Sequence, residues 1–282
     1  MANNNLLLDS CAVELSQAHP PLRAPCIPPG SGRAIALVGD SHATALAGGL
    51  RTIAEKSAYR LVELTKGACP ELEGISVEAY SELGLSPECF SFNLEALDYI
   101  VKDPSIQVVV IAEYWPLLFA TDAVRKGGSN MPLAIGRTKI SQEQKWGYLA
   151  KGLENLVLRL QGSGKVVYLL QDNPNFRFDP VRLMRTRFIG PRRILATQLG
   201  NSSQGYTSDL APDANDPNDL KARIIVGTIA AAHPTTHLLD LRRPLCSSQG
   251  CRFAEGDQVL YVDDAHLSLL GAQVALAELR LP

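Results

Sequence analysis

The stretch Ala34-Ile35-Ala36-Leu37-Val38-Gly39-Asp40-Ser41-His42 decides the fold. Its apolar part has the length of a buried strand, and the residues after Ser41 have the apolar spacing of a helix. A strand that passes directly into a helix is typical of an α/β fold, in which ligands bind at the carboxyl edge of the sheet. A serine at this junction lies beside free backbone N–H groups and the positive end of the helix dipole. Because this position suits a nucleophile whose transition state develops negative charge on oxygen, we interpret Ser41 as a candidate nucleophile.

The rest of the chain alternates strands with helices. The clearest buried strand is residues 106–112, a continuous β-branched run of the kind covered on both faces. The patterns predict strands at 34–38, 59–65, 106–112, 165–170 and 237–241, and helices at 42–56, 93–102, 141–161, 219–232 and 268–279, with a short helix near 191–198. This order indicates an α/β fold: a three-layer α/β/α sandwich around a central, mainly parallel five-stranded sheet.

The division of the chain follows its proline and glycine content. Residues 1–33 are rich in both and predict an extended lead-in, followed by one domain over 34–282. Residues 66–89 read as a loop, and 120–140 as an irregular insertion. The first nine residues lack the basic and apolar regions of a signal peptide, which suggests that the natural protein is longer.

Composition excludes some classes of partner. The 282 residues are 46% hydrophobic and 20% charged, which is typical of a globular domain with a sizeable core. A formal net charge of −2 gives no support for a nucleic-acid or anionic-membrane partner. The sequence has no apolar run of about 18 residues, so this stretch of chain contains no predicted membrane span.

The six cysteines fall into three sequential pairs, each closing a short segment. Six cysteines allow fifteen connectivities, but this clustering favours Cys11–Cys26, Cys69–Cys89 and Cys246–Cys251. Three local disulfides would place the protein in an oxidising compartment, such as a bacterial periplasm or the extracellular space. A zinc site and six buried reduced thiols are the alternatives, although the chain has no C-x-x-C spacing or close Cys/His group.

A candidate base and its orienting acid lie near the C-terminus, in Asp263-Asp264-Ala265-His266. An acid three positions before a histidine can lie on the same turn, where Asp263 would accept a hydrogen bond from one imidazole nitrogen of His266. The other nitrogen would then face Ser41. Asp264 is too close to His266 in sequence to fold back easily. The serine is not in the G-x-S-x-G motif of α/β-hydrolases, because position 43 is Ala.

These motifs resemble those of the SGNH (GDSL-like) hydrolase family, whose fold is flavodoxin-like. Gly39-Asp40-Ser41 matches its first motif and Asp263-x-x-His266 its last. The chain looks more specifically like the SGNH domain fused to bacterial acyltransferase-3 membrane proteins, which O-acetylate cell-surface polysaccharides. The residues that carry this closer resemblance are Val38-Gly39-Asp40-Ser41-His42-Ala43, Gly67-Ala68-Cys69-Pro70, Trp115, Cys246-x4-Cys251 and Tyr261-x-Asp263-Asp264-x-His266-Leu267-Ser268.

The resemblance implies a periplasmic domain, tethered to the inner membrane in the full-length protein, with residues 1–33 as the linker from an absent membrane domain. It would pass an acetyl group, supplied through the fused acyltransferase domain, to a sugar hydroxyl of a surface glycan such as lipopolysaccharide O-antigen. The alternatives are a secreted carbohydrate O-acetyl esterase with the same triad and a catalytically idle glycan-binding domain. We expect no cofactor, no metal and no nucleic acid, and a monomer for the isolated domain.

The oxyanion hole of this family implies three donors, of which the sequence supplies two. The backbone N–H groups of Ser41 and Gly67 are the candidates, whereas Glu113-Tyr114-Trp115 stands where the family has an asparagine after the third strand. Loss of one such donor costs about 100- to 1,000-fold in rate, which argues for a slow or acceptor-dependent enzyme.

The remaining polar and aromatic residues have weaker assignments. Tyr114 and Trp115 are core residues or contacts for a sugar ring. We expect His42 to make a structural hydrogen bond, and Asp40 to serve packing or backbone hydrogen bonds without proton transfer. His233 and His237 read as surface or capping residues, and the arginines of 177–193 as a solvated face or a contact for anionic glycan. Ser41 itself has a structural alternative as a helix N-cap.

Overall fold

The computed structural model describes residues 11–13, 17–74, 76–77, 86–115, 133–135, 138–139, 141–188, 209–213 and 217–282. Most of the predicted insertion at 120–140 and the predicted helix near 191–198 lie outside these residues.

A five-stranded parallel sheet forms the centre of the molecule. Its strands run in the order β2-β1-β4-β7-β9, and every neighbouring pair is parallel. Their bounds are β1 Ala34–Gly39, β2 Arg60–Thr65, β4 Ile106–Ala112, β7 Val166–Gln171 and β9 Thr236–Asp240. The chain order reverses direction between β1 and β4, so the ends of these two strands form the topological switch point at which ligands bind in such sheets.

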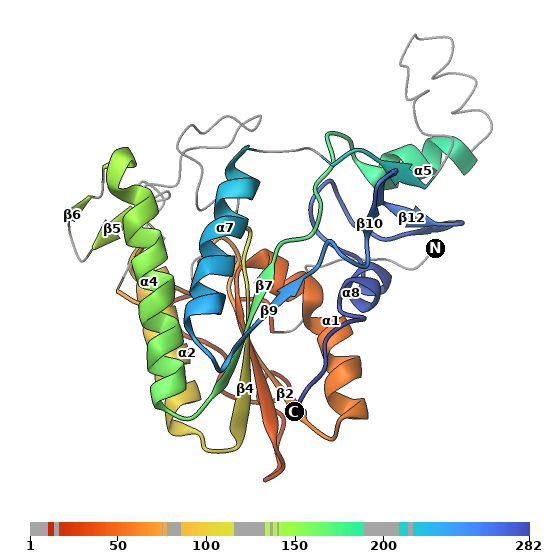
Figure 1. Cartoon of the computed structure of the whole chain (residues 1–282). Helices are drawn as coiled ribbons and strands as arrows, with labels where there is room; N and C mark the ends of the chain where they lie inside the picture. Colours follow the sequence, from red (N-terminus) through yellow and green to blue (C-terminus); the bar gives the residue numbers. More distant parts are fainter. Residues whose placement is uncertain are drawn as a thin grey trace.

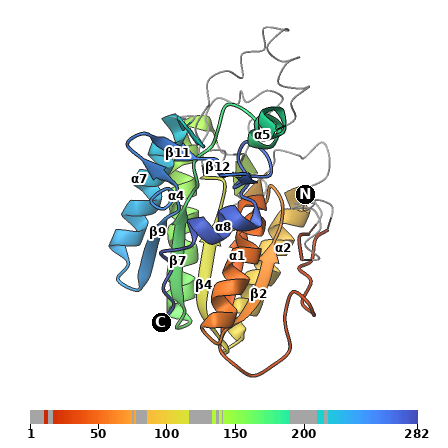
Figure 2. The same cartoon turned by 90° about the vertical axis from the view of Figure 1, so that its right-hand side faces the viewer.

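Helices cover both faces of the sheet, as Figures 1 and 2 show. One face packs against α2 (Ser86–Lys102), α4 (Gln142–Gly162) and α7 (Pro217–Ala232), and the other against α1 (Ser41–Lys56) and α8 (Leu269–Ala275). Each face has its own buried apolar cluster, because side chains along a strand point alternately to opposite sides. The predicted three-layer α/β/α sandwich with five central strands is therefore confirmed.

Close packing of α1 on α8 depends on two small residues. A Cβ at Gly48 would lie 2.7 Å from Leu269 Cδ1, and a Cβ at Gly49 would lie 2.9 Å from backbone and side-chain atoms of Ala272. These glycines let the second half of α1 lie directly against α8. The helix that begins at Ser41 is thereby packed against the helix that follows His266.

Smaller elements lie outside the central sheet. Helix α5 (Pro180–Phe188) was not predicted, and α2 begins seven positions before the predicted start at 93. The short strands are β3 Ser76–Val77, β5 Leu133–Ile135, β6 Thr138–Lys139, β8 Leu210–Ala211, β10 Cys246–Ser247, β11 Gly250–Arg252, β12 Ala254–Glu255 and β13 Gln258–Val259. In Figure 1 the hairpins containing β10 and β12 and helix α5 lie beyond the end to which β9 points.

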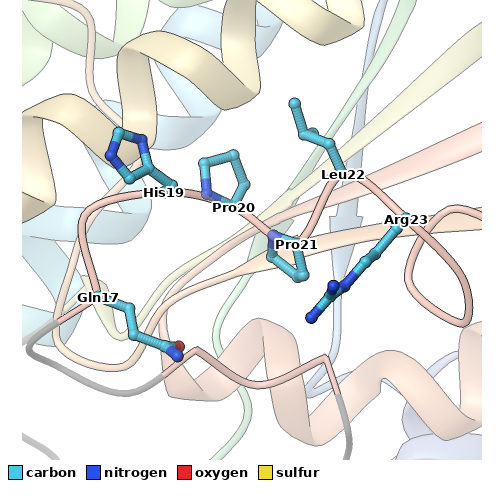
Figure 3. A pocket seen from close by; sticks show the side chains of 6 residues that line it. All are labelled: Gln17, His19, Pro20, Pro21, Leu22 and Arg23. Atoms are coloured by element: carbon cyan, nitrogen blue, oxygen red, sulfur yellow. The ribbon is translucent and has the colours of Figure 1, made fainter.

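The described part of the lead-in lies against the sheet. Val13 forms a parallel bridge with Lys66 and is buried in the core, and the Lys66 ammonium donates to the Gln17 carbonyl oxygen at 2.6 Å. Figure 3 shows a pocket of about 320 Å³ that is lined by Gln17, His19, Pro20, Pro21, Leu22 and Arg23. None of these residues belongs to the predicted active site. The role of 1–33 as a linker stays a prediction.

All six cysteines form disulfides in the predicted pairs, Cys11–Cys26, Cys69–Cys89 and Cys246–Cys251. The pairing leaves no cysteine thiol for the alternatives of zinc ligation or reduced buried cysteines. Among the described helices, none combines the length and apolarity that crossing a bilayer requires.

Candidate active site

The junction between β1 and α1 places Ser41 at the carboxyl edge of the sheet. Gly39 has φ +135°, and a Cβ there would lie 1.9 Å from the carbonyl oxygen of Ala112 at the end of β4. Only glycine fits this close approach of two backbones. Asp40 caps α1 by accepting a hydrogen bond from the His42 N–H at 2.8 Å, so Ser41 becomes the first residue of the helix.

Three side chains predicted from distant parts of the sequence form one continuous chain of hydrogen bonds. The Ser41 Oγ lies 2.8 Å from His266 Nε2, and His266 Nδ1 lies 2.7 Å from Asp263 Oδ2. A carboxylate can only accept, so Nδ1 carries the hydrogen and Nε2 is left to accept the serine proton. This is the geometry that activates a serine for nucleophilic attack.

The carboxylate of Asp263 is held in its ionised form. Burial raises its pKa, but the hydrogen bond and charge of His266 and two backbone donors outweigh burial and lower the pKa to about 2. Those donors are the N–H groups of Ala265 and His266, at 2.8 and 2.7 Å from Oδ1. Asp263 is therefore an acceptor throughout the neutral pH range.

The loop that carries Asp263 and His266 is fixed by its own backbone. Val262 donates to the His266 carbonyl oxygen at 2.9 Å, and Ser268 donates to that of Leu260 at 2.8 Å. The Ser268 hydroxyl then caps α8 by accepting from Gly271. The neighbouring Asp264 does not contact His266 through any described hydrogen bond; its carbonyl oxygen accepts from the Phe176 N–H at 2.9 Å.

Asp40 organises the site through backbone groups, as expected. Its second oxygen accepts from the Tyr114 N–H at 2.9 Å, which ties the end of β4 to the start of α1. Burial raises the pKa of Asp40, against the opposing effect of the neighbouring His42 and of the two backbone hydrogen bonds. The described hydrogen bonds of its carboxylate involve neither Ser41 nor His266.

His42 makes a buried hydrogen bond, as expected, but with a partner that the sequence did not identify. Its Nδ1 lies 2.8 Å from Asp172 Oδ1, at the end of β7, and both side chains are at most 3% exposed. The next residue, Asn173, donates from its side-chain amide to the Ala265 carbonyl oxygen at 2.8 Å. The signal available in the sequence was the polar run Asp172-Asn173-Pro174-Asn175 directly after a buried strand.

The two predicted oxyanion donors lie on neighbouring strand ends. Ser41 follows β1, and Gly67 follows β2 after Lys66, whose N–H donates to the Gly39 carbonyl oxygen at 3.0 Å. Their roles as donors stay predictions. Glu113, at the position of the expected asparagine, is buried and accepts from the Glu71 N–H at 2.7 Å.

The two aromatic residues after β4 have different environments. Trp115 is 2% exposed, and its indole N–H donates to the Leu170 carbonyl oxygen at 2.6 Å, so its ring belongs to the core. Tyr114 is partly exposed, and its ring stacks on His42 with centroids 4.4 Å apart. Of the two, Tyr114 is therefore the better placed to meet a sugar.

The other candidate residues lie away from the triad. His237 is exposed and stacks on Tyr168, and His233 lies 3.8 Å from Glu154. In the arginine-rich segment, Arg187 pairs with Asp209 at 2.7 Å. Within the described ranges, no three His, Cys, Asp or Glu side chains are grouped to hold a metal ion.

Buried carboxyl groups beneath the site predict that stability falls as pH rises. Burial raises the pKa of Glu71 to about 8 from 4.5, against a smaller lowering by Arg159. The folded protein then keeps a proton that the unfolded chain releases, so the free energy of unfolding should fall by up to about 1.4 kcal/mol per pH unit between these values. Urea unfolding at pH 5, 6, 7 and 8 measures this slope.

Glu71→Gln is the matched variant, because an amide cannot titrate. We expect a flatter dependence on pH in this variant, with the remaining slope due to Glu113 and His42, whose pKa values are also raised. Burial is the main cause for Glu113. For His42 burial lowers the pKa, but the charge and hydrogen bond of Asp172 and the charges of Asp40 and Asp263 together outweigh it. An unchanged slope in the variant would show that Glu71 is ionised in the folded protein.

A serine at a strand-to-helix junction, hydrogen bonded to a His–Asp pair three residues apart on a five-stranded parallel sheet, is the arrangement expected of an SGNH-type domain. A family model described as SGNH domain (fused to AT3 domains) matches residues 10–280. The chain belongs to this family.

The chain is similar to solved structures. The periplasmic domain of a lipopolysaccharide acetyltransferase from Salmonella ser. Paratyphi A is 16% identical, with a TM-score of 0.61, covering 90% of this chain and 84% of that one. A GDSL-like lipase from Bacteroides thetaiotaomicron is 10% identical, with a TM-score of 0.43, covering 88% of this chain and 86% of that one. A search of curated proteins finds no match.

Proposed function

We propose that this domain transfers an acetyl group, through acetyl-Ser41, to a sugar hydroxyl of a bacterial cell-surface polysaccharide. The observation that carries the proposal is the hydrogen-bond chain from Ser41 through His266 to Asp263, in a chain whose family is fused to AT3 domains. The fold likeness to a periplasmic domain of a lipopolysaccharide acetyltransferase agrees with a glycan acceptor. The acyl donor would come through a fused membrane domain, with this domain in the periplasm.

The first half of the reaction forms the acetyl-serine. His266 Nε2 accepts the Ser41 proton as Oγ attacks the carbonyl carbon of the acetyl donor. The oxyanion that forms is stabilised by the N–H groups of Ser41 and Gly67. When the carbon–leaving-group bond breaks, His266 returns the proton to the leaving group. Asp263 stays ionised throughout and stabilises the imidazolium.

The second half uses the same groups with the sugar as nucleophile. His266 Nε2 accepts the proton of a sugar hydroxyl, whose oxygen attacks the acetyl carbon of acetyl-Ser41. The bond to Ser41 Oγ then breaks, and the proton passes from His266 to the serine. In this proposal Tyr114 contacts the sugar ring, because it is the partly exposed aromatic side chain at the carboxyl end of β4.

Mass spectrometry of acceptor glycans tests the proposal. The purified domain is incubated with a chromogenic acetyl ester and oligosaccharide acceptors, and acetylated sugar is expected with wild type and absent with Ser41→Ala. Hydrolysis of the ester without acetylated sugar would favour the esterase alternative. Neither product, with retained glycan binding, would favour an idle binding domain.

The Tyr114 contact has its own variants. Tyr114→Ala should raise the KM for the acceptor by about tenfold, whereas Tyr114→Phe keeps the ring and should change it little. Equal effects of the two substitutions would point to the hydroxyl group rather than to ring stacking.

A further inference from the structure

A second histidine–carboxylate pair lies directly beside the first. His42 and Asp172 are joined by a 2.8 Å hydrogen bond and are 3% and 2% exposed, so both are removed from water. Burial lowers the pKa of His42, but the charge and hydrogen bond of Asp172 outweigh burial and raise it. A buried pair of this kind contributes little net stability, because desolvation of the two groups offsets their attraction.

The pair is also incompletely hydrogen bonded. Within the described part of the chain, His42 Nε2 and Asp172 Oδ2 are buried without a hydrogen-bond partner. Each unsatisfied group adds a desolvation cost, which an apolar pair of the same shape would avoid. The pair therefore lowers the stability of the fold. We infer that it has a role other than stabilising the structure.

The ring of His42 packs against the ring of His266. The two imidazole centroids are 4.7 Å apart, with their planes inclined by 51°. Tyr114 stacks on His42 at 4.4 Å with an interplanar angle of 9°. Because Asp40 binds the backbone N–H groups of both His42 and Tyr114, this stack is fixed to the start of the nucleophile helix.

The segment that begins at Asp172 also holds the loop of the base. Asn173 donates to the Ala265 carbonyl oxygen at 2.8 Å, and Phe176 donates to that of Asp264 at 2.9 Å. Residues 172–176 are thus bonded to α1 through His42 and to the loop of His266 through two backbone carbonyl groups. They join the two halves of the triad, which come from opposite ends of the described chain.

We propose that His42 and Asp172 are positioning residues, which hold the imidazole of His266 in line with Ser41. The inference rests on the proposed function of Ser41 and His266. The other charged groups near His42 are Asp40 and Asp263, and Arg242 interacts electrostatically with Asp172. None of these groups replaces the contact between the two imidazole rings.

Positioning predicts a specific kinetic signature. A displacement of a catalytic group by about 1 Å costs on the order of 100-fold in rate. Loss of the hydrogen bond that orients a metal-ligating histidine costs about 10- to 100-fold, and we take the same range for a group that orients a catalytic histidine. His42→Gln and Asp172→Asn should therefore lower kcat by about 10- to 100-fold with KM for the acetyl ester little changed. The double variant should be about as slow as either single variant, because both act through one contact.

The experiment combines steady-state kinetics with the rate at which a fluorophosphonate labels Ser41, followed by intact mass. His237→Gln is the matched control, since it removes a histidine stacked on a tyrosine, Tyr168, away from the triad. We expect slow labelling and low kcat in His42→Gln and Asp172→Asn, and wild-type values in His237→Gln. Thermal unfolding shows whether each variant is folded.

The outcomes separate this inference from the proposed function. Wild type that neither turns over ester nor labels at Ser41 would overturn the proposed function. If the wild type turns over the ester and is labelled at Ser41, and the folded His42 and Asp172 variants are as fast as the wild type, the positioning role alone is overturned. A rise in KM at unchanged kcat would also overturn it, as would unfolding of both single variants, because the pair would then serve substrate binding or the fold.

Discussion

Replacing Ser41 with alanine is expected to lower kcat for acetyl transfer and for ester hydrolysis by a factor on the order of 10⁴ or more. The Ser41 Oγ is the atom bonded to His266 Nε2, so its removal leaves the base without a nucleophile to activate. The residual rate would come from binding of the acetyl donor and from the N–H groups of the oxyanion hole, with water as the attacking nucleophile. Stopped-flow or steady-state kinetics with a chromogenic acetyl ester measures the loss.

The same loss should appear when the base is removed. His266→Ala is expected to be about as slow as Ser41→Ala, and the double variant no slower, because the two groups act as a unit. Asp263→Asn should also be slow, since an amide can stabilise the wrong tautomer of His266.

Ser268→Ala is the control for the structural alternative. Ser268 caps α8 through its hydroxyl, so its loss should cost about 1 kcal/mol of stability and leave kcat unchanged. If Ser41→Ala behaved in the same way, losing stability while keeping its rate, Ser41 would be a helix-terminal residue and the proposed mechanism would be wrong.

Replacing Gly39 with alanine should destabilise the protein by more than about 3 kcal/mol or prevent its folding. The added Cβ would lie 1.9 Å from the Ala112 carbonyl oxygen, and that atom belongs to the backbone of the central sheet. The left-handed φ of +135° adds strain that only glycine avoids. Relief would require β1 and β4 to separate at the end where Ser41 and Tyr114 emerge.

Gly164→Ala distinguishes the backbone strain of a positive φ from the steric clash of an added Cβ. Gly164 has φ +80°, but no atom lies within 4 Å of the added Cβ, so about 1–2 kcal/mol is expected from the backbone alone. Urea unfolding of both variants gives the comparison. Equal losses would show that the contact with Ala112 relaxes without cost, contrary to the expectation.

The central sheet could be predicted from the sequence because four of its strands, β1, β2, β4 and β7, are buried on both faces. Residues 106–112 have the bounds of β4. The predicted strands 34–38 and 59–65 differ from the observed ones by one residue at one end, and 165–170 and 237–241 are displaced by one residue at both ends. A continuous apolar run between polar turns leaves few alternatives to a covered strand. The helices that turn an apolar stripe toward the sheet could be predicted in the same way, from apolar residues that alternate with polar ones at helical spacing.

The first residues of the helices were harder to predict, because capping residues determine them rather than apolar spacing. Helix α5 begins at Pro180 after Asp179, whose carboxylate accepts from the Arg182 N–H at 3.0 Å. An acid followed by proline is a helix-start signal, but the arginines that follow obscured it. Helix α2 likewise begins near Pro87, before the apolar residues that predicted it.

The triad could be predicted because its residues flank recognisable elements: Ser41 begins a helix after a strand, and His266 follows Asp263 by three positions. The His42–Asp172 pair could not, since its members are 130 positions apart and neither belongs to a short motif. For a similar reason the sequence did not decide whether Trp115 is a core residue or a sugar contact. Side-chain direction at a strand end depends on the tertiary packing, here on the bond to Leu170.

Ser41 and His266 are 225 positions apart, which sets the order in which the site can be assembled. Synthesis delivers α1 early, whereas the loop of residues 260–268 and α8 follow after all five strands of the sheet. In the proposed mechanism the serine hydroxyl has no base until α8 docks on Gly48 and Gly49, and before that step it is as unreactive as any surface serine. We therefore expect a nascent or truncated chain to be unreactive, and reactivity to begin only when the native structure is complete.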